Sequence, residues 1–156
     1  MNGAPAAERN RFAFGLLLIS LIAFAAFHFL PTTPSDINAG QPGWSFWKAI
    51  VTETRDLATM TAKTVLCFSS ILMAALLIIA GPFLVRSFAS FRLGWAIACI
   101  FSFLALCGAS GFLYRHWFAW SDDPVSPGFY ALAASQAFNL AGYVFIRKGK
   151  RPMPAV

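Results

Sequence analysis

The sequence predicts an all-α, polytopic membrane protein: four transmembrane helices in a bundle with one outer amphipathic helix. Of the 156 residues, 58% are hydrophobic and only 12% are charged, whereas soluble domains carry about 25% charged residues. The apolar residues form four blocks, each long enough to cross about 30 Å of hydrocarbon as a helix. Helices satisfy their own backbone hydrogen bonds in lipid, and no block alternates as a barrel strand would.

The four blocks and the polar stretches between them divide the chain into nine segments. In chain order these are a cytoplasmic N-terminus (1–11), a first span (12–30), an outer loop (31–62), a second span (63–85), a cytoplasmic hairpin (86–92), a third span (93–117), an outer loop (118–125), a fourth span (126–146) and a basic cytoplasmic tail (147–156). The apolar core of the first span is too long for a cleaved signal peptide. We expect Gly81-Pro82 to kink or end the second helix. In the fourth, Ser126 can cap the helix and Pro127 fits its first turn.

The orientation follows from the lysines and arginines. The N-terminus and the hairpin each contribute two, and the tail contributes four, which leaves four of the twelve for the other side. By the positive-inside rule both termini are cytoplasmic. The basic tail then suits anionic membrane lipids, and no nucleic-acid partner is needed to explain it. A small basic chain of this layout indicates a bacterial inner (cytoplasmic) membrane.

The first outer loop contains the predicted amphipathic helix, at about residues 45–60. Its apolar stripe consists of Trp47, Ile50, Val51, Leu57 and Ala58. Polar and charged residues occupy the rest of the helix. The segment could lie on the outer membrane surface or continue directly into the second span, and we favour a bend near residues 61–63.

The two histidines, His28 and His116, are the candidate cofactor ligands. Both lie at the outer end of a span, and the two spans run in the same direction, so the rings are expected at similar depth. Two histidines on different helices of a bundle could bind haem b or copper. Histidine also suits the membrane interface without any ligand. We favour the interface interpretation, and no metal site is predicted. The three cysteines, Cys67, Cys99 and Cys107, lie inside spans and indicate packing rather than disulfides.

Small and polar residues in the third and fourth spans predict a helix–helix interface. They are Gly108, Gly111, Ala133, Ser135, Gln136, Ala137, Asn139 and Ala141. The three alanines recur every four residues and permit close approach of another helix. Exposing two amides to lipid would be costly, so we expect the polar patch to face protein. It could bond within the bundle, pair with a partner subunit or line a solute path.

No acid or base lies in the middle of a span, and no nucleotide-binding or catalytic motif is present, so an enzyme is not predicted. The leading hypothesis is a non-enzymatic membrane protein that acts by helix–helix association. It would be an accessory or assembly subunit, or a scaffold, in a homo-oligomer or a larger membrane complex. The alternatives are a haem or copper redox module using His28 and His116, and a passive small-solute channel or carrier.

Overall fold

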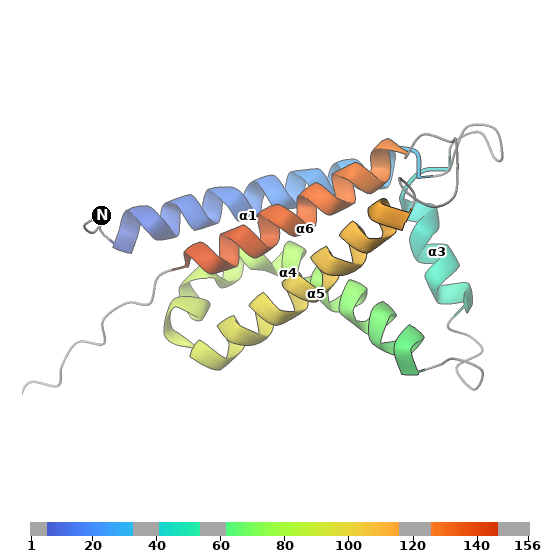
Figure 1. The fold of residues 1–156 in the computed structure, drawn as a ribbon. Helices are drawn as coiled ribbons and strands as arrows, with labels where there is room; N and C mark the ends of the chain where they lie inside the picture. The colour runs from blue at the N-terminus through green and yellow to red at the C-terminus, as the bar shows by residue number, and fades with distance from the viewer. Residues whose placement is uncertain (1–5, 33–40, 54–61, 116–125, 147–156) are drawn as a thin grey trace, which may run out of the picture.

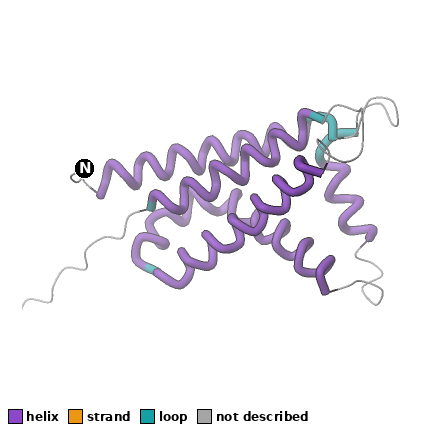
Figure 2. Tube along the Cα trace, viewed as in Figure 1, coloured by secondary structure: helices purple, strands orange, loops and turns teal. Residues whose placement is uncertain are grey.

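The computed structural model describes residues 6–32, 41–53, 62–115 and 126–146. Its helices are α1 (Ala6–Phe29), α3 (Trp44–Glu53), α4 (Ala62–Ser90), α5 (Arg92–Arg115) and α6 (Pro127–Phe145). Figure 2 shows helix along nearly all of these residues, and no strand forms among them. The predicted all-α class is confirmed over this part of the chain.

Three of these helices are long and apolar enough to cross a membrane, which supports membrane association. The qualifying segments are Glu8–Phe29, Ser69–Ser90 and Arg92–Gly111, within α1, α4 and α5. Helix α6 is not among them. Gln136 and Asn139 lie in the middle of its 19 residues and lower its mean hydropathy. The fourth predicted span therefore stays a prediction.

Helices α1 and α6 run side by side in opposite directions, and α4 and α5 lie against this pair (Figure 1). The contact between α1 and α6 is the most extensive in the structure. Its buried residues on α1 are Ala13, Leu17, Ser20, Phe24 and Phe27, and those on α6 and its C-cap are Gly128, Leu132, Ser135, Asn139, Gly142 and Ile146. Both sets alternate between steps of four and three residues, as in a coiled-coil seam. We call this contact the α1–α6 seam.

Helix α4 does not end at Gly81-Pro82. It continues to Ser90 with Pro82 buried inside it, and only Phe91 separates it from α5. Of the two expectations for this dipeptide, a kink or a helix end, the helix end was therefore wrong, and most of the predicted hairpin is helical. Packing explains the difference, because the Tyr143 hydroxyl of α6 donates a 2.7 Å hydrogen bond to the Leu77 carbonyl, one turn before Gly81. Gly81 leaves room for this ring, since a Cβ there would lie 2.9 Å from the Tyr143 hydroxyl.

Backbone hydrogen bonds join α1, α3 and α6 at the predicted outer end. The Gly43 amide donates to the Leu30 carbonyl at 3.0 Å, and the Gly128 amide donates to the Pro31 carbonyl at 3.0 Å. Ser126 occupies the N-cap position of α6, but its side chain makes no capping hydrogen bond. The expectation that the Ser126 side chain caps α6 was therefore wrong, although Ser126 is the N-cap residue. Helix α3 is described to Glu53, so residues 54–60 of the predicted amphipathic helix lie outside the described residues.

We expect Gly142→Ala to destabilise the protein by about 1–3 kcal/mol, the usual cost of overpacking. The added Cβ would lie 2.6 Å from the Leu17 Cγ, inside the α1–α6 seam. Gly15→Ala in α1 is the matched control, because a Cβ there meets nothing within 4 Å. That substitution should be neutral or stabilise by up to about 1 kcal/mol. Thermal unfolding in mild detergent measures both, and equal effects would contradict the seam.

Candidate functional site

Five polar side chains meet in the interior of the bundle and form what we call the polar layer. Ser20 comes from α1, Ser102 from α5, and Ser135, Gln136 and Asn139 come from α6. Gln136 is 3% exposed, and the other four are fully buried. The polar patch predicted from the fourth span therefore faces protein within the chain, as its expected cost in lipid requires.

Two hydrogen bonds in the polar layer connect α6 to its neighbours. The Ser20 hydroxyl of α1 donates to the Ser135 carbonyl at 2.8 Å. The Asn139 side-chain amide donates to the Ser102 hydroxyl of α5 at 2.9 Å. Because each bond joins a different helix to α6, the layer holds α6 between α1 and α5.

Three oxygen atoms of the polar layer have no hydrogen-bond partner among the protein's own atoms. They are the Ser135 Oγ, the Gln136 Oε1 and the Asn139 Oδ1. A buried polar atom without a partner costs about 1–3 kcal/mol. Folded domains are stable by only about 5–15 kcal/mol. Unpaired atoms in the polar layer would therefore remove a substantial part of the free energy of unfolding.

The alanine row and the glycines of the predicted interface lie outside the polar layer. Ala133 and Ala141 are half-buried and Ala137 is exposed, so the row borders the buried stripe of α6 instead of forming it. Gly108 and Gly111 on α5 are exposed, and a Cβ at either would meet nothing within 4 Å. Helices α5 and α6 do pack against each other, but not through these two glycines. Their role toward a partner stays a prediction.

His28 uses both ring nitrogens for hydrogen bonds. Its Nδ1 lies 2.7 Å from the Phe24 carbonyl, and the Trp47 indole Nε1 lies 2.9 Å from its Nε2. An indole can only donate and a carbonyl can only accept. These bonds therefore require a neutral ring with its proton on Nδ1. Trp47 thereby connects α3 to α1.

The His28 ring sits in an aromatic cluster made of Phe24, Phe27, His28, Phe46 and Trp47. The His28 and Trp47 rings are stacked with centroids 6.1 Å apart, and Phe24 meets the His28 ring edge-on at 4.7 Å. A metal ion or haem iron that bound the His28 Nε2 would have to displace the Trp47 indole. His116, the second predicted ligand, lies outside the described residues.

The described residues offer little else for chemistry. No group of three His, Cys, Asp or Glu side chains that could hold a metal ion occurs among them. Cys99 is a half-buried thiol and Cys107 an exposed one; the side chain of Cys67 is outside the described set. Comparison of the chain with protein-family models, with curated proteins and with solved structures gives no match.

Two residues that position α6 were not singled out in the sequence for this role. Tyr143 is fully buried, and the Trp95 indole donates to its backbone carbonyl at 2.8 Å. This bond joins α5 to the last turn of α6. The signal that could have found Tyr143 is its place beside Gly142 in the four-and-three spacing of buried positions along α6.

We expect Trp47→Phe to loosen α3, because the substitution keeps an aromatic ring but removes the donor to His28. Loss of one hydrogen bond costs about 1 kcal/mol, so amide hydrogen exchange in α3 should accelerate several-fold. Trp44→Phe is the matched control on the same helix, since Trp44 is 57% exposed. Equal exchange rates in the two variants would show that the indole bond does not anchor α3.

Proposed function

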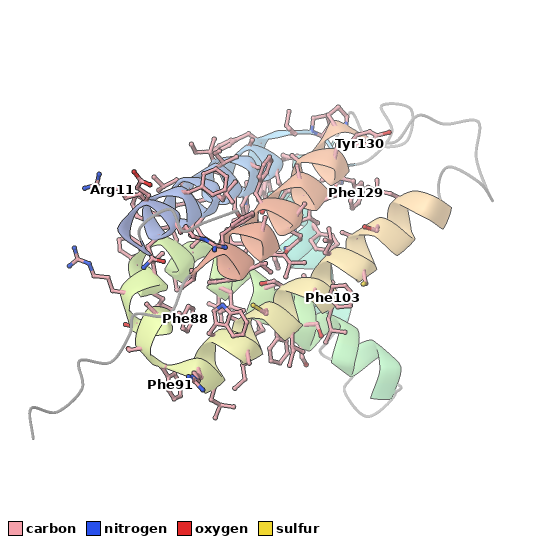
Figure 3. All side chains as sticks on the ribbon, turned by 60° about the vertical axis from the view of Figure 1, so that its left-hand side comes forward. Arg11, Phe88, Phe91, Phe103, Phe129 and Tyr130 are labelled. Carbon is pink, nitrogen blue, oxygen red and sulfur yellow. The ribbon has the colours of Figure 1, made fainter. Side chains whose placement is uncertain are left out.

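We propose that this chain is a non-enzymatic integral membrane protein that acts by helix–helix association, as an accessory or assembly subunit or a scaffold of a membrane complex. The outward face of α5 carries the proposal. Six exposed residues follow one another there at steps of four and three: Leu93, Ile97, Ile100, Leu104, Cys107 and Gly111. We call them the α5 stripe. Phe103 in Figure 3 borders it and is 55% exposed.

The composition of the stripe favours a helix over lipid as its neighbour. Its first four residues are large and apolar, whereas its outer part is small, with Cys107, Gly111 and the adjacent Gly108. A glycine inside a helix costs about 0.5–1 kcal/mol relative to alanine. A Cβ at Gly108 or Gly111 would meet nothing within 4 Å, so no packing contact within this chain compensates the cost of these glycines. Small residues at a membrane interface let two helix backbones approach closely, which would explain their presence.

In the proposed arrangement α6 is the fourth span and both termini are cytoplasmic, as the distribution of basic residues favours. Burial of Gln136 and Asn139 supports this role for α6, because the side chains that it exposes include Tyr130, Phe138 and Val144. The start of α1 and the end of α6 lie toward the same end of the bundle (Figure 1), which agrees with termini in one compartment. A bacterial inner membrane is the proposed location.

The proposed partners are membrane lipids and a second copy of the chain or another membrane subunit. Native electrophoresis of membranes dissolved in mild detergent tests this directly. We expect a complex larger than the monomer. In a variant with Cys67→Ala and Cys99→Ala, oxidation should form a covalent product through Cys107, whose mass tells a second copy from a different subunit. A strictly monomeric protein with no co-purifying subunit would contradict the proposal.

We expect Gly111→Leu to weaken this assembly while the monomer stays folded, because the new side chain meets open space within the chain. Gly108→Leu should act in the same direction. Gly15→Leu on α1 makes the same change at another open position and should leave the complex intact. Ala137→Leu asks whether the exposed side of α6 also takes part. The ratio of complex to monomer on native gels measures each effect. Equal ratios for Gly111→Leu and Gly15→Leu would remove the α5 stripe as the interface.

A further inference from the structure

We propose that the polar layer is a binding site for a small neutral hydrogen-bond donor, namely water, held between α1, α5 and α6. The proposal does not depend on association with a partner, because every side chain of the layer belongs to one chain. It rests on the three buried oxygens without a partner and on the chemistry around them.

The layer needs donors. The Ser135 Oγ, Gln136 Oε1 and Asn139 Oδ1 all belong to α6. Asn139 lies three residues from Gln136 and four from Ser135, so its side chain neighbours both on the helix surface, whereas Ser135 and Gln136 are consecutive. Turning an amide over would exchange its oxygen for nitrogen and leave one atom per amide still unpartnered. Water donates and accepts, so it fits either orientation.

The ligand is neutral because the layer contains no charge to balance an ion. The described charged residues on α1, α4 and α5 lie near the helix ends, such as Arg11, Arg86 and Arg92. A cation in this interior would lose its hydration without a carboxylate to compensate it. An anion would face the Gln136 Oε1 and the Asn139 Oδ1, which can only accept hydrogen bonds.

The ligand is small because the surrounding helices enclose it. The five members of the polar layer are at most 3% exposed. A lipid hydroxyl or a larger solute would require α6 to part from α1 or α5. Buried water commonly makes about three hydrogen bonds to polar groups that the protein leaves unpaired. The three orphan oxygens are unpaired polar groups of this kind.

Magnetisation transfer from water in NMR of the ¹⁵N-labelled full chain in lipid nanodiscs tests the proposal. We expect cross peaks between water and the side-chain amide protons of Gln136 and Asn139, assigned by their loss in Gln136→Met and Asn139→Leu. The cross peaks should be unchanged when sodium chloride is replaced by choline chloride. Absence of the cross peaks would overturn the proposal, and a sodium-dependent shift of these amides would overturn the neutral ligand.

Thermal unfolding gives a second readout whose sign separates a hydrated layer from a dry one. Ser135→Ala removes only an oxygen that makes no bond to the protein, and Gln136→Met removes another at similar volume. If water binds these atoms, both variants should melt at a lower temperature than the parent. If the layer is dry, both lose a penalty and should melt at the same or a higher temperature, which would contradict the proposal.

Ser20→Ala and Ser110→Ala are the positive and negative controls for the change in melting temperature. Ser20→Ala removes the observed bond to the Ser135 carbonyl and should lower the melting temperature whether or not water is present. Ser110 is exposed on α5, so Ser110→Ala should leave the melting temperature unchanged. For a hydrated layer, the shifts of Ser135→Ala and Gln136→Met should exceed that of Ser110→Ala.

Discussion

The burial of two amides in the middle of an apolar helix is the constraint on which the packing of α6 depends. Gln136 and Asn139 interrupt an otherwise apolar helix, and the structure buries both, with Asn139 bonded to Ser102 of α5. Placing α6 in this way sets the α1–α6 seam, because Ser135 and Asn139 belong to that seam and to the polar layer at once. In coiled coils a single buried polar residue can define register at some expense of stability. The polar layer is suited to the same role here.

Glycine serves two opposite purposes in the same fold. Gly142 and Gly81 lie where another side chain approaches too closely for a Cβ, so they are required by packing within the chain. Gly108 and Gly111 have open space around them. Internal packing therefore explains the first pair but not the second. The two ends of the bundle also differ, since aromatic stacking and the His28–Trp47 bond fasten α3 at one end only.

The sequence was sufficient to predict the helical class, three helices long and apolar enough to cross a membrane, and the burial of the fourth span's polar patch. These features depend on composition and on the cost of unpaired amides in an apolar environment. The partner of each helix face depends on long-range packing, which spacing alone does not determine. The alanine row at every fourth residue suggested one face of α6, whereas the buried face follows steps of four and three. Likewise, the local sequence around Pro82 favours a helix end. The hydrogen bond from Tyr143 of α6 to the Leu77 carbonyl helps to accommodate Pro82 within α4. The hydrogen bond between His28 and Trp47 depends on the position of α3 relative to α1. The local sequence pattern does not determine that position.

We propose that α6 crosses the bilayer with its amides turned inward, so that the chain spans the membrane four times. The most direct test is the sidedness of reporters fused to Met1 and to Val156 of the full chain, measured in intact cells. Four crossings predict that both reporters lie in the same compartment, the cytoplasm. Reporters in opposite compartments would mean an odd number of crossings and would contradict the account.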